Sequence, residues 1–202
     1  MTSTTFTNGS TLTDDDYFND LDRLHYDILG DPANITAIKA LVGQTLSTEQ
    51  ASTSGTSIDF TSIPSWVQKI HVVFSGVSTS GTSNIIIQIG DSGGVETSGY
   101  LGSCISILAG AGTPSGHSPT TGFGVTANTL STNIHHGTAT LILENSSNFT
   151  WACTSIMSCS EAIYVKYGSG VKSTSAALDR IRITTVNGSD TFDAGAINIA
   201  YE

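Results

Sequence analysis

The stretch LDRIRITT, residues 178–185, alternates between two kinds of side chain. In an extended segment the odd-numbered positions share one face, which carries both isoleucines. The even-numbered positions share the other face, which carries both arginines. Alternation with a period of two is typical of a half-buried β-strand.

Eight further segments have strand patterns: 58–60, 67–74, 85–89, 101–108, 138–144, 149–157, 162–167 and 194–201. Asn145-Ser-Ser-Asn148 and Asn187-Gly188 predict hairpin turns between them. The stretch 110–136 contains two prolines and five glycines, which predicts a long loop. Strands without intervening helices predict a mainly β fold, an antiparallel, jelly-roll-like β-sandwich over residues 58–202.

The N-terminal part has a different pattern, a short α-helical segment within residues 1–45. Thr13 is a good N-cap for a helix at about 14–29, and Gly30 suits its end. A shorter helix is expected at 34–42. Their apolar positions form one narrow stripe: Tyr17, Leu21, Leu24, Ile28, Ile35 and Ile38.

That stripe needs a partner, because one short amphipathic helix is marginal in water. It either packs on the β domain of the same chain or forms an oligomer or virion interface with other chains. Residues 46–57 are rich in Ser and Thr, lack apolar periodicity and are interpreted as a linker.

Charge excludes several classes of function. The 202 residues carry a net charge of −10 with only seven Lys and Arg, so a nucleic-acid-binding surface is not expected. No apolar run reaches the ~18 residues of a membrane helix, and the start resembles no secretory signal. We therefore expect synthesis in the cytoplasm without membrane insertion, and Cys104, Cys153 and Cys159 as buried free thiols.

The string GDSGG, residues 90–94, matches the nucleophile region of chymotrypsin-like proteases. Such a protease places its His, its Asp and a barrel before the Ser. Here only 91 residues precede Ser92, and about 50 of them are predicted helix and linker. We therefore interpret GDSGG as a turn.

His135 and His136 would point to opposite faces of a strand and could not chelate one ion there. A metal ring in a trimer is one alternative, and an exposed loop pair is favoured. No carboxylate pair stands out, and the sequence predicts no catalytic residue, metal or cofactor.

Three stretches carry a resemblance to tailed-bacteriophage fibres and accessory virion proteins. Residues 6–21, FTNGSTLTDDDYFNDL, resemble the segments by which phage fibres attach to virions. Residues 76–84 with 90–100, GVSTSGTSN and GDSGGVETSGY, resemble a β module of phage proteins, and residues 178–202 resemble its closing strands. The resemblance implies a non-enzymatic structural protein of the virion (tail, neck or head fibre).

In such a protein residues 1–45 would bind other virion proteins, the chain would form a homotrimer, and the β domain would face outward for host adsorption. One alternative is a carbohydrate-binding module that recognises a host surface glycan, with Trp66, Tyr100 and Phe123 as candidate contacts. Trp151 and Tyr167 belong to the same wider set of aromatics. A second alternative is a glycan depolymerase.

Overall fold

The computed structural model describes residues 43–108, 110, 113–161 and 163–202. These residues form fourteen β-strands, and no helix among them could cross a membrane. The prediction of a mainly β protein is confirmed. The predicted helices at 14–29 and 34–42, with the apolar stripe, lie outside the described residues, so the stripe remains a prediction.

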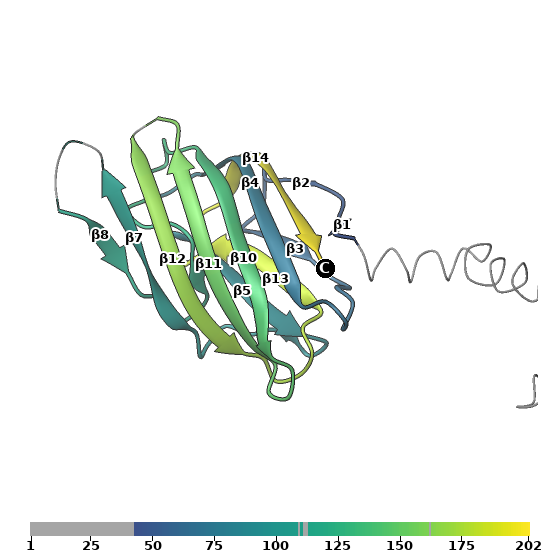
Figure 1. The fold of residues 1–202 in the computed structure, drawn as a ribbon. Helices are drawn as coiled ribbons and strands as arrows, with labels where there is room; N and C mark the ends of the chain where they lie inside the picture. Colours follow the sequence, from purple (N-terminus) through teal and green to yellow (C-terminus); the bar gives the residue numbers. More distant parts are fainter. Residues whose placement is uncertain (1–42, 109, 111–112, 162) are drawn as a thin grey trace, which may run out of the picture. The chain divides into compact units, whose positions relative to one another are not determined.

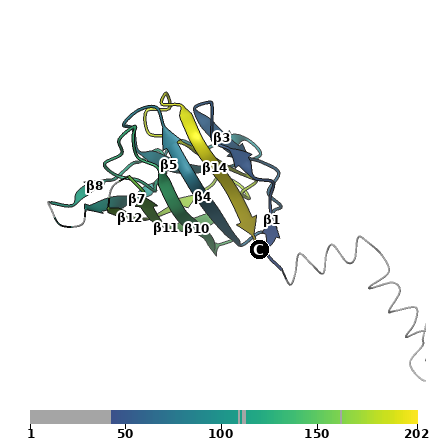
Figure 2. The ribbon, with the colours of Figure 1, turned by 90° about the horizontal axis from the view of Figure 1, so that it is seen from above.

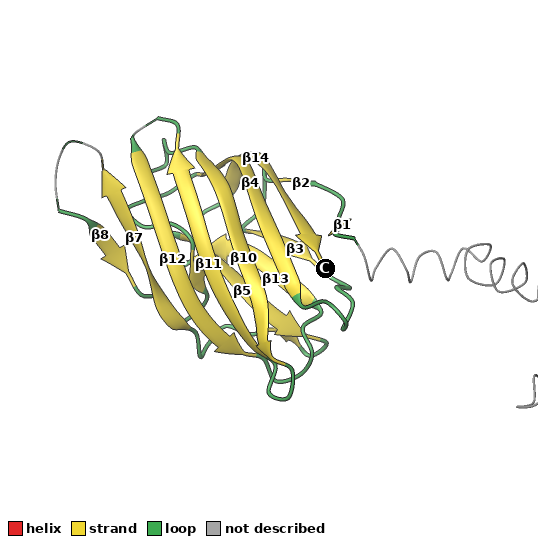
Figure 3. Cartoon of the chain, in the orientation of Figure 1, coloured by secondary structure: helices red, strands yellow, loops and turns green. Residues whose placement is uncertain are grey.

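All strand pairs are antiparallel and form two sheets (Figures 1 and 3). The larger sheet has nine strands in the order β1-β14-β4-β10-β11-β12-β7-β8, with β2 also paired to β14. Its strands are β1 (Thr45–Leu46), β2 (Gln50–Ala51), β4 (Lys69–Thr79), β7 (Leu101–Leu108), β8 (Ser115–His117), β10 (His135–Asn145), β11 (Thr150–Cys159), β12 (Tyr164–Ser173) and β14 (Phe192–Tyr201).

The smaller sheet has five strands in the order β3-β13-β5-β6, with β9 also paired to β5. Its strands are β3 (Ser57–Phe60), β5 (Ile85–Asp91), β6 (Gly94–Val95), β9 (Phe123–Gly124) and β13 (Arg180–Thr185). In Figure 1 the larger sheet faces the viewer, and β5 and β13 lie behind it; Figure 2 shows the succession from β14 to β8 from above.

One hydrophobic core joins side chains from both sheets. Val72 of β4 and Leu141 of β10 are fully buried in it together with Ile87 of β5. The alternation of residues 178–185 is confirmed, because Ile181 and Ile183 of β13 are completely buried there. On the opposite face the Arg182 guanidinium donates two hydrogen bonds, of 2.7 and 2.9 Å, to the Asp59 carboxylate of β3.

The linker prediction for residues 46–57 is corrected, because this segment belongs to the β unit, which begins at Gln44. Strand β1 pairs Thr45 with Tyr201, and β2 also pairs with β14. Ser52 is fully buried, and its hydroxyl donates to the Ala194 carbonyl at 2.8 Å. These short strands are held by backbone bonds, so they need no apolar periodicity.

The predicted loop at 110–136 contains two short strands, β8 and β9. Strand β9 can approach the larger sheet because the residues beneath it on β12 are glycines. A Cβ on Gly168 would lie 2.2 Å from the Gly124 carbonyl oxygen, and one on Gly170 would lie 3.2 Å from the Phe123 ring. Glycine composition therefore reflects close packing here as well as loop formation.

The two predicted turns differ in their outcome. The Asn145 turn joins β10 to β11 as a hairpin, and the Asn145 carboxamide oxygen accepts the Ser147 N–H at 2.8 Å. Asn187-Gly188 is a turn, with Gly188 at φ +65°, but it joins β13 to β14, which lie in different sheets. The hairpin prediction is therefore wrong at Asn187, whose side chain organises a crossing connection by accepting the Ser189 N–H at 3.0 Å.

Candidate functional site

Outward side chains of the larger sheet form straight rows, because directly paired residues on neighbouring strands lie side by side. One row crosses five strands: Val73 of β4, Thr138 of β10, Ile156 of β11, Tyr167 of β12 and Ile105 of β7. Its apolar members are exposed, Ile156 by 57% and Tyr167 by 45%. We call this the apolar row.

Two further rows run parallel to the apolar row. The hydroxyl row consists of His71, Thr140, Thr154, Ser169 and Ser103. Beyond it, the second apolar row consists of Lys69, Ile142, Ala152, Val171 and Leu101. These fifteen residues are called the outer face below.

The outer face has almost no charge in a chain whose net charge is −10. None of its fifteen residues has a carboxylate, and its two basic side chains, Lys69 and His71, both lie on β4 at one border. Lys69 is paired with the Glu202 carboxylate at 2.6 Å, and His71 Nδ1 lies 2.9 Å from the Thr140 hydroxyl. Such a face suits an uncharged partner. It also suits a second acidic chain, provided that the contact surface of that chain is uncharged as well.

Two strands of this face have their polarity reversed. On β12 the outward residues Val165, Tyr167 and Val171 are exposed, whereas Lys166 and Lys172 point inward and are buried. On β7 the outward residues Leu101, Ile105 and Ile107 are exposed, whereas Cys104 and Ser106 are buried. A half-solvated antiparallel sheet normally places its apolar residues inside, so exposed apolar rows indicate a contact surface.

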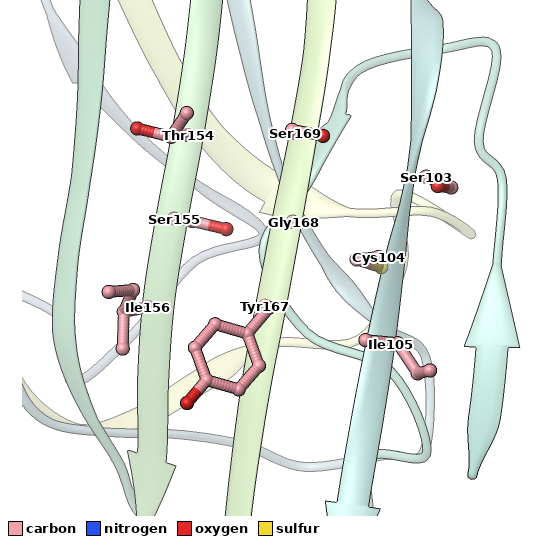
Figure 4. Close-up of a pocket in the computed structure, with 9 residues that line it drawn as sticks. All are labelled: Ser103, Cys104, Ile105, Thr154, Ser155, Ile156, Tyr167, Gly168 and Ser169. Atoms are coloured by element: carbon pink, nitrogen blue, oxygen red, sulfur yellow. The ribbon is translucent and has the colours of Figure 1, made fainter.

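A shallow groove of about 420 Å³ lies over β11, β12 and β7 of the outer face. Ser155, Gly168 and Cys104, whose side chains or Cα atoms alternate with the outward residues, line it between the apolar row and the hydroxyl row. In Figure 4 the Tyr167 ring lies beside Ile156 at one border, and the polar side chains of Thr154 and Ser169 lie at the other; the complete lining is Ser103, Cys104, Ile105, Thr154, Ser155, Ile156, Tyr167, Gly168 and Ser169. An aromatic ring beside hydroxyl groups offers both stacking and hydrogen bonding.

Two of the three predicted glycan contacts are core residues, so this prediction is wrong for Tyr100 and Phe123. Their side chains are 1% and 4% exposed, with ring centroids 4.9 Å apart in an edge-to-face arrangement. The Tyr100 hydroxyl accepts the Ile89 N–H at 2.7 Å, which satisfies its polar end without solvent. Trp66 is 43% exposed, but its ring lies 5.9 Å from that of Tyr201, away from the groove.

Of the wider set of aromatics, Trp151 is buried and Tyr167 is exposed in the groove. The groove therefore contains Tyr167, one of the aromatics that the sequence analysis considered. Its other lining residues include Ile156, Thr154 and Ser169, which the sequence analysis did not identify. Strand alternation could have grouped these three residues on one face. It could not have shown that this face is the uncovered one.

The GDSGG string forms a tight turn between β5 and β6, as predicted. The Asp91 carboxylate accepts the Gly93 N–H at 2.8 Å and a hydrogen bond from the Ser175 hydroxyl. Ser92 is exposed at the tip. Within the described part of the chain, no histidine is hydrogen-bonded to Ser92 or to Asp91, so no catalytic triad is assembled there.

The carboxyl groups of Asp91 and Glu96 meet at Ser175, whose N–H donates to Glu96 at 2.6 Å. Hydrogen bonds from the Ser175 hydroxyl and the Gly93 amide lower the pKa of Asp91. Burial alone would raise the pKa of Glu96, but the Lys172 ion pair and the Ser175 amide outweigh it and lower that pKa. Two ionised carboxylates cannot include the general acid of a glycosidase, which needs a raised pKa; their bonds tie β5 and β6 to the end of β12.

His135 and His136 begin strand β10, so the prediction of an exposed loop pair is wrong. Their side chains point to opposite faces, as expected for a strand. His135 is fully buried, and His136 Nδ1 accepts the Gly76 N–H at 3.1 Å. Across residues 43–202 as described, no group of three His, Cys, Asp or Glu could hold a metal ion.

All three cysteines are free and buried, as predicted. Burial raises the pKa of Cys104 to about 11 and that of Cys153 to about 12, so both thiols stay protonated at neutral pH and are poor nucleophiles. Cys104 Sγ lies 3.4 Å from His117 Nδ1, but the raised pKa argues against a thiolate there.

Comparisons of the chain with protein-family models, with curated proteins and with solved structures found no match.

Proposed function

We propose that this chain is a non-enzymatic structural protein of a tailed-bacteriophage virion, such as a tail, neck or head fibre. Residues 1–45 attach it to other virion proteins. Residues 44–202 form a jelly-roll-like β-sandwich that is displayed outward and contacts the host surface. The resemblance of residues 6–21 to attachment segments supports the first role. Connections that cross between the sheets, such as β4 to β5 and β12 to β13, support the jelly-roll description.

The observation that carries the proposal is the reversed polarity of β7 and β12. Three exposed apolar side chains on each strand would be costly to leave in water, at roughly 25 cal/mol per Å² of apolar surface. Copies of a chain with net charge −10 repel one another unless they meet through a surface without acids. The outer face meets this requirement. We therefore infer that it packs against the other copies of a homotrimer.

The test introduces a carboxylate into the outer face of the full chain. Ile156→Asp places the charge at the centre of the apolar row and should convert the trimer into monomers in multi-angle light scattering at micromolar concentration. Val186→Asp is the matched control, because Val186 is also apolar and exposed but follows β13, away from the outer face. A monomeric wild-type chain, or a trimer that survives Ile156→Asp, would show that the outer face is not the interface.

Attachment needs a separate experiment. A chain that begins at Gln44 keeps β1 and β2 and should fold, yet it should be missing from assembled particles. Residues 1–45 fused to an unrelated reporter should be incorporated. Normal incorporation of the chain that lacks residues 1–43 would place the attachment surface on the β unit instead.

A second candidate function is glycan recognition in the groove, and Tyr167 is the observation that favours it. Its exposed ring lies beside Ile156 at one border of the groove, and the hydroxyl groups of Thr154 and Ser169 lie at the other (Figure 4), a combination suited to the apolar face and hydroxyls of a sugar. Tyr167→Ala should abolish binding on a glycan array, whereas Trp66→Ala should leave it intact. An array without wild-type binding would exclude this candidate for the glycans tested.

A further inference from the structure

Strand β12 buries two lysines on the inner face of the larger sheet, and the described residues supply a counter-charge to only one of them. Lys172 is 9% exposed, forms an ion pair with Glu96 and donates to the Ser173 carbonyl at 2.7 Å. Lys166 is 0% exposed, and within the described residues its amine forms neither a hydrogen bond nor an ion pair. Both amines lie over a tyrosine ring, at 5.7 Å for Lys172 and 5.6 Å for Lys166. The Glu96 carboxylate and the Ser173 carbonyl therefore distinguish the Lys172 site from the Lys166 site.

The surroundings of Lys166 are rich in donors. It is paired directly with Ser106 of β7 and with Met157 of β11, and Ser155 is the inward residue next to Met157. The hydroxyls of Ser106 and Ser155 are buried without a partner in the described structure. Both ring nitrogens of His135, one strand further away, are buried and unpartnered as well.

The electrostatics of this cluster leave a positive charge without compensation. Burial lowers the pKa of Lys166 to about 8. In its protonated form the amine carries a charge that no carboxylate of the described residues compensates. Burial, and then the charge of Lys166, lower the pKa of His135 to about 3, so the imidazole stays neutral and can donate one N–H.

A buried ammonium without a partner is strongly unfavourable, because the interior replaces neither its hydration nor its counter-charge. The chain supplies a carboxylate to Lys172 through Glu96, but the described residues supply none to Lys166. We propose that Lys166, Ser106 and Ser155 form a buried site for a compact monovalent anion, chloride or a carboxylate group, with His135 at its margin. The anion accepts the ammonium and hydroxyl hydrogens and neutralises the charge. This proposal does not depend on the proposed virion role.

The test uses linkage between anion binding and unfolding of the full chain. Thermal midpoints are compared in sodium chloride, sodium formate and sodium gluconate at equal ionic strength, gluconate being too large for a compact buried site. A ligand at about 100 times its Kd should raise the midpoint by roughly 5–10 °C. A rise in chloride alone identifies the inorganic ion, and a larger rise in formate identifies a carboxylate. Equal midpoints in all three salts would overturn the proposal and indicate that ordered water satisfies the cluster.

Two variants locate the site. Lys166→Met should remove the dependence on chloride and formate, whereas Lys172→Met should lower stability but retain the dependence, because its partner belongs to the chain. If Lys166→Met does not fold, Ser106→Ala should weaken the dependence, and wild-type crystals soaked in bromide should show an anomalous peak beside Lys166 Nζ. A dependence unchanged by Lys166→Met, or no such peak in the bromide crystals, would also overturn the proposal.

Discussion

Replacement of Tyr100 by Phe tests the reassignment of this residue from a sugar contact to a core residue. The substitution removes one oxygen and leaves the ring packed edge-to-face on Phe123. That oxygen accepts the Ile89 N–H at 2.7 Å and donates to the carbonyls of Glu96 and Ile89, at 2.9 and 3.2 Å. Loss of two net hydrogen bonds, with a buried amide left unpaired, should cost about 2–3 kcal/mol.

Urea and thermal denaturation of the full chain measure this cost. The midpoint of the β unit should fall by roughly 5–10 °C. Tyr167→Phe is the matched control, because it removes the same atom from an exposed ring and should change stability by less than about 0.5 kcal/mol. Equal stability of the Tyr100→Phe variant and the wild type would refute the reasoning. Loss of glycan binding without loss of stability would restore Tyr100 as a ligand contact.

Three further outcomes follow from other contacts. Gly168→Ala should destabilise the chain by more than about 3 kcal/mol in thermal denaturation, because the new Cβ would collide with the Gly124 carbonyl oxygen. Gly188→Ala should cost only about 1 kcal/mol, because Gly188 has a φ of +65° but no atom lies close to the position of the new Cβ. The pKa of His135 is about 3 in the folded chain and has its ordinary value of about 6.5 in the unfolded chain, so the unfolded chain alone takes up this proton between pH 6.5 and pH 5. Stability should therefore fall by about 1.6 kcal/mol over this range in low-chloride buffer, and His135→Leu should flatten this slope in urea titrations. Ser92→Ala should leave fold and assembly unchanged, and labelling of Ser92 by a fluorophosphonate in the folded protein would contradict its assignment to a turn.

The sequence predicts strands well where apolar and polar residues alternate against one buried face. Ile181 and Ile183 are the clearest case, since their side of the smaller sheet faces the hydrophobic core. Alternation also divides the residues of β7 and β12 correctly into two sets, one for each face of the sheet. It does not reveal that Leu101 and Ile105 face outward, because that depends on strand β9 of the smaller sheet, which covers the side occupied by Cys104 and the glycines.

Other differences arise from contacts that leave no periodic signal. Strands β1 and β2 are two residues each and depend on backbone bonds to β14, so composition alone makes them look like a linker. Tyr100 looks like a surface aromatic because its hydroxyl needs partners, and those partners are backbone groups nearby in the sequence. The groove around Tyr167 depends on register across three strands, which only the paired structure provides.

The pairing of Thr45 with Tyr201 places the first and last strand residues of the β unit beside each other. Glu202 is also fixed there, because its backbone N–H and carbonyl exchange hydrogen bonds with Lys69. A short peptide could therefore join Glu202 to Gln44, and the chain could be opened at the exposed turn between Ser146 and Ser147 instead. Such a circular permutation would preserve every strand pair, so the order of the strands along the polypeptide is separable from their arrangement in space.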